Sequence, residues 1–243
     1  VIPIIEQEFD DFETEAGKFL GNEIEEIDFI GFRLKQGVYG QRQGGDNQML
    51  RVKAPYGALT PDQLDRLADV AERYSRGWGH LTTRQNVQVH FVPLERIPDL
   101  MRDIASVGLT SREACGDTVR NVQGCHLAGA CPYEILDISA WAEAAHQHFL
   151  RHPLGQRLPR KFKINFSGCT TDCGQAMFND AGVVAVSRTP PAPPPATAPR
   201  PPPATAARAA PAPTGRDAAR PPRPARALAL RRRARPPAPL PPP

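Results

Sequence analysis

The spacing of apolar residues predicts alternating strands and helices between residues 49 and 104. Residues 49–52 and 81–92 are predicted strands, the second with Val87, Val89 and Phe91 on one face. Apolar residues recur at helical spacing in 64–74 and again in 97–104. Strand, helix, strand, helix in this order is half of a ferredoxin-like α+β sandwich.

The start of the first helix is marked by its own capping residues. Thr60 is a suitable N-cap, Pro61 occupies the first helical position, and Gln63 stands where a capping box needs a glutamine. We therefore expect this helix to begin at residue 61 and to end near Gly77 or Gly79.

Later in the chain the pattern predicts a helix at 140–150 and strands at 160–167 and 182–186. In the first of these strands, Lys161 and Lys163 alternate with apolar residues, so both should lie on one face. His146 and His148 do not share a face of the helix, which makes a metal site there improbable on geometry and predicts solvent exposure. Residues 1–36 mix acids with Phe and Ile and are interpreted as an extended arm lying on a larger body.

Composition divides the chain at about residue 188. Residues 188–243 contain 20 of the 28 prolines, 11 of the 30 basic residues and one acid, Asp217. The segment has no aromatic residue and no Ile, Val or Met, so it is predicted to be disordered. Residues 1–187 carry 19 basic and 25 acidic side chains, so the formal +4 of the chain describes neither part.

The tail has two explanations. Its Ala, Pro and Arg codons are those that an out-of-frame stretch of a GC-rich gene would give, which suggests a frameshift near Arg188 and a missing native continuation. The alternative is a genuine Arg- and Pro-rich tail that attracts nucleic acid by charge.

Several classes of protein are excluded by the rest of the chain. No apolar run approaches the length of a membrane helix, and the N-terminal 28 residues hold ten acids and one Lys, Lys18. Membrane spanning, secretion and a basic targeting peptide are not expected, and we expect a cytoplasmic protein. Five cysteines then indicate metal or redox chemistry rather than a disulfide framework.

Four of these cysteines form two local pairs, Cys125 with Cys131 and Cys169 with Cys173. A cubane iron–sulfur cluster needs four thiolates, and two loops that give two each can supply them. Structural zinc usually takes tighter cysteine spacings with histidine partners. From spacing alone, four unconnected buried cysteines stay open as an alternative, and Cys115 is interpreted as structural.

The motifs around these cysteines, taken together and in order, resemble those of the sirohaem-dependent nitrite and sulfite reductases. They are LTTRQNVQ (81–88), GDTVRNVQGC (116–125), CPYE (131–134), LPRKFK (158–163) and SGCTTDCG (167–174). The resemblance covers roughly residues 37–187 and is to the N-terminal half of such an enzyme.

The resemblance implies a domain order. An arm at 1–36 precedes a ferredoxin-like half-domain at 37–110 and part of a sirohaem and 4Fe–4S α+β domain at 111–187, followed by the disordered tail at 188–243. In this family two such halves are related by a pseudo-twofold axis, and sirohaem and a [4Fe–4S] cluster lie where they meet. The second half is therefore an expected partner.

The resemblance also implies the site residues. Arg84, Arg120, Lys161 and Lys163 match the positions that line the anion site, where fixed positive charge suits sulfite, nitrite and the sirohaem carboxylates. Gln85 and Asn121 stand beside the two arginines and are predicted to hydrogen-bond sirohaem. The cluster positions are matched by Cys125, Cys131, Cys169 and Cys173, with Cys173 in the position that bridges to the haem iron.

One feature departs from the family. Familiar assimilatory members take the cluster cysteines from the second half and the anion-binding bases from the first, whereas both sets occur here together. Either this half holds its own cluster, or its cysteines are relics of a duplicated site.

The function implied is six-electron reduction of sulfite to sulfide or of nitrite to ammonia, with ferredoxin or a flavoprotein as electron donor. The chain itself, lacking half of the pocket, is expected to be inactive. The alternatives are an iron–sulfur electron carrier without catalysis and a nucleic-acid-binding protein acting through its tail, although nucleic acid is not the expected partner.

Overall fold

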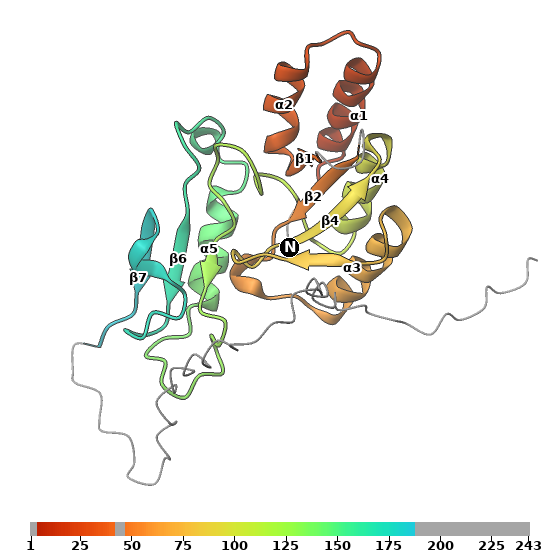
Figure 1. Cartoon of the computed structure of the whole chain (residues 1–243). Helices are drawn as coiled ribbons and strands as arrows, with labels where there is room; N and C mark the ends of the chain where they lie inside the picture. The colour runs from red at the N-terminus through yellow and green to blue at the C-terminus, as the bar shows by residue number, and fades with distance from the viewer. Residues whose placement is uncertain (1–3, 42–46, 188–243) are drawn as a thin grey trace, which may run out of the picture. The chain divides into compact units, whose positions relative to one another are not determined.

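A computed structural model describes residues 4–41 and 47–187, and these residues form an α+β fold with two sheets (Figure 1). The predicted disordered tail at 188–243 lies outside the described residues. Besides the helices and strands, the described residues form four short 3-10 turns: η1 (Pro55–Gly57), η2 (Leu94–Arg96), η3 (Pro153–Gly155) and η4 (Ala176–Phe178). None of the described helices is both long enough and apolar enough to cross a membrane.

The first sheet is antiparallel and has the strand order β1-β2-β4-β3. Its strands are β1 (Val38–Gly40), β2 (Gln48–Val52), β3 (Gly79–Leu81) and β4 (Val87–Val92). Helix α3 (Pro61–Tyr74) joins β2 to β3, and α4 (Ile97–Ala105) follows β4. An isolated bridge between Lys53 and Thr110 brings the chain back beside β2. This is the predicted ferredoxin-like arrangement.

The capping prediction for α3 is confirmed. The Thr60 hydroxyl accepts from the Gln63 backbone N–H at 3.3 Å, and the Gln63 side chain accepts from the Thr60 N–H at 3.0 Å. Both bonds satisfy donors that the first helical turn leaves free. Alternate strand residues such as Leu50, Val52 and Val89 are buried against α3 and α4, so one face of the sheet forms the core.

The predicted single strand at 81–92 is wrong, because it is a hairpin. Strands β3 and β4 pair with each other, and residues 82–86 form the turn between them. The turn is closed by the Thr82 N–H donating to the Asn86 carbonyl at 2.9 Å, with Gln85 in the left-handed region at φ 56°. Near its end, β4 is also irregular: Phe91 has φ 59°, and the pairing with β2 shifts there.

The extended arm predicted at the N-terminus is wrong as well. Helices α1 (Glu6–Leu20) and α2 (Glu26–Lys35) occupy this segment and lie together in Figure 1. Phe9, Phe12 and Ala16 are buried at helical spacing on α1, and the Phe12 ring lies 6.2 Å from that of Phe29 on α2. These side chains join the core of the first sheet. The many acids between them obscure the helical period in the sequence.

The second sheet is parallel and has the order β5-β6-β7. It consists of β5 (Gln123–Gly124), β6 (Ile164–Ser167) and β7 (Ala181–Val184), with α5 (Ser139–Phe149) connecting β5 to β6. Ala142 of α5 packs with Ile164 and Phe166 in a second core. The second lobe is therefore a small βαβ unit.

Strand β6 is shorter than the strand predicted at 160–167. Before Ile164, only Phe162 makes a bridge, to Val119, so Lys161 and Lys163 stand outside the strand. All four residues of β6 are buried, including Asn165, so the strand does not have the one exposed face that the alternation predicted. A strand covered on both faces, as is usual for parallel sheets, loses that alternation.

A buried carboxylate, Glu113, ties the two sheets together. Its Oε2 lies 3.7 Å from Nζ of Lys53, at the end of β2, and both side chains are almost wholly buried. Its Oε1 accepts from the backbone N–H of Arg151 at 2.9 Å and from the side chain of Gln156. Burial, opposed by the charge of Glu113, lowers the pKa of Lys53 to about 8.

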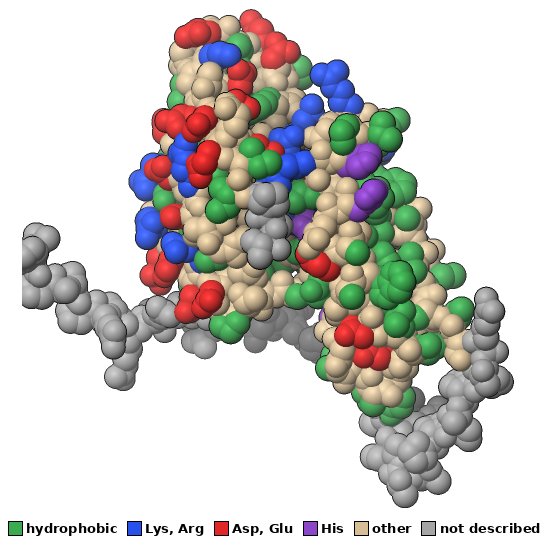
Figure 2. All heavy atoms as spheres, turned by 180° about the vertical axis from the view of Figure 1, so that it is seen from behind, with side chains coloured by type: hydrophobic (Ala, Val, Ile, Leu, Met, Phe, Trp, Pro, Cys, Tyr) green, Lys and Arg blue, Asp and Glu red, His purple; other side chains and the backbone are tan. Residues whose placement is uncertain are grey.

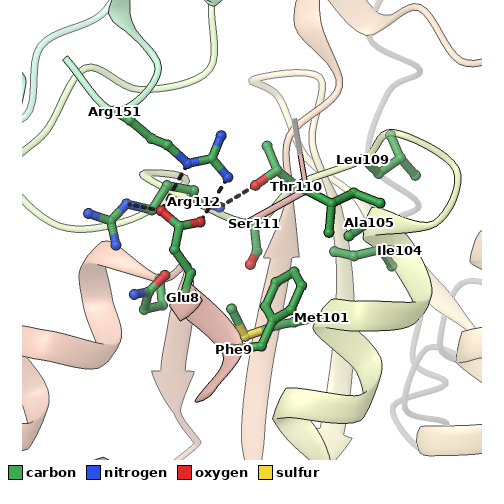
Figure 3. A pocket seen from close by; sticks show the side chains of 12 residues that line it. Glu8, Phe9, Met101, Ile104, Ala105, Leu109, Thr110, Ser111, Arg112 and Arg151 are labelled. Atoms are coloured by element: carbon green, nitrogen blue, oxygen red, sulfur yellow. Dashed lines mark hydrogen bonds and ion pairs between the residues drawn. The ribbon is translucent and has the colours of Figure 1, made fainter. Parts of the chain in front are cut away.

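The same network reaches α1, as Figure 3 shows. The Arg151 guanidinium donates two bonds to the Glu8 carboxylate, at 2.9 and 2.8 Å, and the Arg112 Nε lies 3.7 Å from the same carboxylate. Arg112 also donates to Gln156 at 2.8 Å. One polar network thus connects the N-terminal helix, β2 and the second lobe.

His146 on α5 is buried, and the prediction that it is exposed is wrong. Burial, followed by the charges of Lys53 and Arg151, lowers its pKa to about 3. His148, two residues along the helix, is exposed as predicted. The face of α5 that packs on the second core therefore includes His146.

Replacing Glu113 by Leu should leave the Lys53 ammonium buried without a partner and lower the free energy of unfolding by about 3 kcal/mol. Urea denaturation measures this loss, and the exposed Glu95→Leu substitution is the control. A double variant with Lys53→Met should recover most of the loss, because it removes both charges. Equal losses in the single and double variants would contradict the pairing.

The His146→Leu variant should depend less on pH than the parent chain. The pKa of this histidine falls from 6.5 to about 3 on folding, so its contribution to stability is full above pH 6.5. That contribution is lost as the pH falls from 6.5 toward 3. Denaturation at pH 7 and pH 5 should therefore show a smaller difference for His146→Leu than for the parent. The exposed His148→Leu control should behave as the parent does; identical pH dependence in all three would refute the assignment.

Candidate functional site

Three arginines converge on a small cavity between the first sheet and the loop that precedes the second. The cavity has a volume of about 140 Å³ and is lined by Arg51, Thr82, Thr83, Arg84, Asn86, Ala114 and Arg120. Arg51 comes from β2, Arg84 from the turn between β3 and β4, and Arg120 from the loop before β5. Within the part of the chain that the structure describes, no acidic side chain lines this cavity. Its chemistry is that of an anion site.

Arg84 is held rigidly by groups of the second lobe. Its Nη2 donates to the Asn121 carbonyl at 2.8 Å, and its Nη1 donates to the side-chain oxygens of Asn165 and Asn179, both at 3.3 Å. Burial, followed by the charge of Arg120, lowers the pKa of Arg84 to about 10. The guanidinium therefore stays protonated at neutral pH, and a bound anion would relieve its repulsion from Arg120.

Arg120 is oriented by its own loop. Its Nε donates to the Gly116 carbonyl and its Nη1 to the Ala114 carbonyl, both at 2.9 Å. Neutral acceptors fix the guanidinium without cancelling its charge. Arg120 is only half-buried, so its charge can reach a ligand in the cavity.

Arg51 is a cavity-lining residue that the sequence interpretation missed. It lies 5.4 Å over the Tyr39 ring, and the Gln88 side-chain oxygen accepts from its Nη2 at 2.6 Å and its Nε at 3.0 Å. A signal was present, because Leu50 and Val52 on either side of it are core residues. Strand alternation alone puts Arg51 on the opposite, polar face of the sheet.

Lys161 and Lys163 lie outside this cavity. Lys161 is exposed and Lys163 is half-buried. They flank Phe162, whose backbone pairs with the arginine loop: the Arg120 N–H donates to the Phe162 carbonyl at 2.8 Å. Both lysines are thus neighbours of the residue whose backbone pairs with Arg120, but their side chains do not line the cavity.

The side-chain amides of Gln85 and Asn121 are used by the protein itself. Gln85 exchanges two hydrogen bonds with the backbone of Gly124, at 2.9 and 3.1 Å. Asn121 is wholly buried and donates to the Ala54 carbonyl at 2.8 Å and the Arg84 carbonyl at 3.0 Å. This geometry favours positioning of the arginine turn over the direct contact with sirohaem that the sequence predicted.

The four paired cysteines lie on two loops that contact each other. The Cys125 N–H donates to the Phe166 carbonyl at 3.0 Å, and the Ile135 N–H donates to the Gly168 carbonyl at 2.8 Å. The Cys125 thiol lies near those of Cys173 and Cys131. Burial raises the pKa of Cys125.

The donor set of these loops fits an iron–sulfur cluster. Cys125 is buried, Cys131 and Cys169 are half-buried, and Cys173 is exposed, so the loops present thiols from the core to the surface. Four thiols are the ligands that a [4Fe–4S] cluster takes. Within 4–41 and 47–187, however, no three metal-ligating side chains are gathered closely enough to hold a single metal ion. Cys125 and Cys173 come from different loops and lie near each other.

Cys115 is separate from this group. It is wholly buried, and burial raises its pKa to about 11 even though Arg51 and Arg120 oppose the shift. A thiol that stays protonated at neutral pH is a poor ligand and a poor nucleophile. Its surroundings agree with the structural role predicted for it.

The surface of the second lobe is rich in exposed apolar side chains. Figure 2 shows hydrophobic groups gathered over this lobe and acidic groups gathered over the N-terminal helices. The most exposed of the apolar residues around β7 are Met177, Phe178 and Val186, at 79%, 74% and 68%. Exposed apolar patches of this kind usually mark contacts with other protein segments.

Comparison with family models gives two matches in series. Residues 39–107 match the nitrite/sulfite reductase ferredoxin-like half domain, and residues 115–199 match the nitrite and sulphite reductase 4Fe-4S domain. Together the matches cover more than half of the chain. The second continues past Arg188, into the segment interpreted as the tail.

Curated relatives agree with these matches. The chain is 37% identical over 158 residues to an assimilatory ferredoxin-dependent nitrite reductase of Haloferax mediterranei, covering 60% of this chain and 27% of that protein. It is 33% identical over 161 residues to a sulfite reductase [ferredoxin] of Mycobacterium tuberculosis, covering 63% of this chain and 29% of that protein. The chain therefore spans less than a third of the length of these relatives.

Among solved structures, the NirA protein of Mycobacterium tuberculosis is similar, with a TM-score of 0.57 and 33% identity. The similarity covers 60% of this chain and 30% of that one. The structural similarity thus covers about the same share of each chain as the sequence similarity does.

The Arg51→Gln and Arg120→Gln variants should each bind sulfite at least about tenfold more weakly than the parent chain, because each removes a charge-assisted donor from the cavity. Calorimetric titration at low salt measures the affinity, and circular dichroism checks the fold. Arg157→Gln is the control, since Arg157 is exposed and lies outside this cavity. Equal affinities in all four proteins would exclude the cavity as the anion site.

Proposed function

The chain belongs to the nitrite/sulfite reductase family, and we propose that it forms the anion-binding part of an enzyme that reduces sulfite to sulfide or nitrite to ammonia by six electrons. The observation that supports this most directly is the cavity lined by Arg51, Arg84 and Arg120. A protein that only carried electrons would need the cysteines but not three arginines around one cavity. Sulfite and nitrite have the same demand for positive charge, so both substrates are retained.

The arginines bind and orient the substrate in this proposal. Each guanidinium is a planar donor that suits an oxyanion, and Arg84 remains charged at neutral pH despite its burial. Because Arg84 and Arg120 are already fixed by carbonyl and amide oxygens, little conformational entropy is lost when the anion enters. The arginines stabilise negative charge and do not supply protons.

Lys161 and Lys163 are the proposed proton donors. A lysine ammonium can release a proton as an S–O or N–O bond breaks, whereas a guanidinium does not. Both residues flank Phe162, whose carbonyl accepts from the backbone N–H of Arg120. The two lysines therefore lie on a segment that is hydrogen-bonded to the arginine loop. Their proposed role requires the side chains to turn toward the anion when the cofactor-bound site is complete.

Cys125, Cys131, Cys169 and Cys173 are the residues that would hold the [4Fe–4S] cluster, with Cys173 as the proposed bridge to sirohaem. When bound, these two cofactors supply the electrons for the reduction. Sirohaem is rich in carboxylates, and the polar face of the first sheet, which presents Arg51, Gln88 and His80, is the proposed surface for them.

The remaining parts of the proposal concern partners. We propose that a second half of the enzyme covers the apolar surface around Phe178, because the chain spans less than a third of its relatives. The relatives' names include ferredoxin, which makes ferredoxin the proposed electron donor over a flavoprotein. We propose that the enzyme works in the cytoplasm and that this chain alone does not turn over.

The proposal is tested by an absorption spectrum and iron analysis of the chain, purified anaerobically after coexpression with sirohaem synthesis. We expect sirohaem bands and cluster iron, both lost in Cys→Ser variants of Cys125, Cys131, Cys169 and Cys173. The matched control is Cys115→Ser, which should keep both because Cys115 is buried away from the two loops. A colourless, iron-free parent chain would show that this half does not hold its own centre, and the cysteines would then be relics.

A further inference from the structure

The turn that carries Arg84 is docked onto the strand that leads into Cys125. Three side-chain amides hold it there: Asn121 donates to the Arg84 carbonyl at 3.0 Å, Gln123 donates to the Thr83 carbonyl at 2.8 Å, and Gln85 bonds Gly124. The bonds cross between segments about 40 residues apart in sequence. The anion cavity and the first cysteine loop are therefore parts of one hydrogen-bonded unit.

Within this unit, the side-chain amide of Gln85 takes the place that a neighbouring strand would have. Its Nε2 donates to the Gly124 carbonyl at 2.9 Å, and its Oε1 accepts from the Gly124 N–H at 3.1 Å. Gly124 belongs to β5, which among the described residues pairs with β6 on one side. The primary amide of Gln85 thus gives the open edge of β5 the donor and acceptor that a neighbouring backbone would give.

Gly124 is closely packed on the face where a side chain would stand. A Cβ on it would lie 2.7 Å from the Ile138 Cδ1 and 2.7 Å from the Tyr56 Cβ. On its other edge it is paired with Phe166, and the next N–H, that of Cys125, donates to the Phe166 carbonyl. A displacement of Gly124 would carry Cys125 with it and would change the contact between the Cys125 and Cys173 thiols.

We propose that Gln85 is a positioning residue for Cys125, which it holds through Gly124 at a fixed place relative to the arginine cavity. The left-handed backbone of Gln85, at φ 56°, directs its side chain to β5 while Arg84 next to it lines the cavity. Adjacent residues of one turn thus serve the anion and the cysteine loop. The inference rests on the proposed role of Cys125 as a cluster ligand, and it replaces a direct contact between Gln85 and sirohaem.

The test measures how well the Cys125 thiol is held near Cys173, with no cofactor present. In a background with Cys115, Cys131 and Cys169 changed to Ser, glutathione redox buffers give the effective concentration of the Cys125 thiol toward Cys173. Two thiols and one oxidised glutathione yield the protein disulfide and two reduced glutathiones, so the balance reports how well the two sulfurs are held together. Gln85→Asn keeps the amide and tolerates the left-handed backbone, but it is one carbon too short to reach Gly124.

We expect Gln85→Asn to lower the effective concentration about tenfold, because both bonds to Gly124 are lost. Gln85→Glu keeps the length and one acceptor, and should lower it by a smaller factor. Gln147→Asn is the matched control, since the Gln147 side chain is exposed and bonds only within α5, to Glu143. Circular dichroism and urea denaturation show whether each variant is folded.

Effective concentrations within twofold of the parent for both Gln85 variants would overturn the inference. A tenfold loss in Gln85→Asn that tracks a global loss of fold, with Gln85→Glu folded and unchanged, would overturn it equally. If the parent chain takes up no iron but the Gln85 variants still lose effective concentration, the proposed function loses its cluster while the positioning role stands. The two hypotheses therefore fail separately.

Discussion

The arrangement of the two lobes depends on one buried carboxylate, Glu113, and on the need to satisfy it. A carboxylate taken out of water is costly unless it is paired and hydrogen-bonded. Lys53, which follows β2, pairs with Glu113 at 3.7 Å, and the Arg151 backbone and Gln156 donate to its Oε1, so three separate segments meet at one point. Arg151 and Arg112 extend the constraint to Glu8 on α1. The loop that begins at Glu113 and carries Arg120 is thereby held over the first sheet.

The anion cavity follows from that constraint. Once the loop is fixed, Arg120 is directed by the carbonyls of Ala114 and Gly116, and Arg51 and Arg84 approach from the sheet. Three like charges at close range repel one another, and the hydrogen bonds that orient Arg84 and Arg120 go to neutral oxygens. Burial and the charge of Arg120 lower the pKa of Arg84, so both destabilise its charged guanidinium in the folded state. Such a cavity is arranged in advance for a negative ligand.

Local patterns predicted much of this fold, and long-range contacts account for what they missed. The capping box of Thr60 and the helical period of α3 and α4 are properties of neighbouring residues, so the sequence shows them directly. The environment of His146 comes from distant segments, since Lys53 and Arg151 act on it. The hairpin at 79–92 is local, but its turn at 82–86 has no Gly or Pro that would mark it in the sequence. For the site, motif order indicated Arg84, Arg120 and the cysteines. Strand alternation could have placed Arg51 on the polar face of the sheet, but only the structure shows that it lines the same cavity. The role of Gln85 required the position of Gly124, which no local pattern contains.

The two-residue length of β5 has a consequence for the order in which the chain folds. A strand so short cannot pair stably by itself. Its partner β6 follows it by about 40 residues, and β7, which pairs with β6, follows it by about 57. The turn at 82–86, in contrast, is complete as soon as β3 and β4 have formed their hairpin. On a chain synthesised from its N-terminus, the first lobe can therefore exist before the second and act as its template. Folding can thus proceed from the first lobe to the second, with the side-chain amide of Gln85 in place before Gly124 arrives.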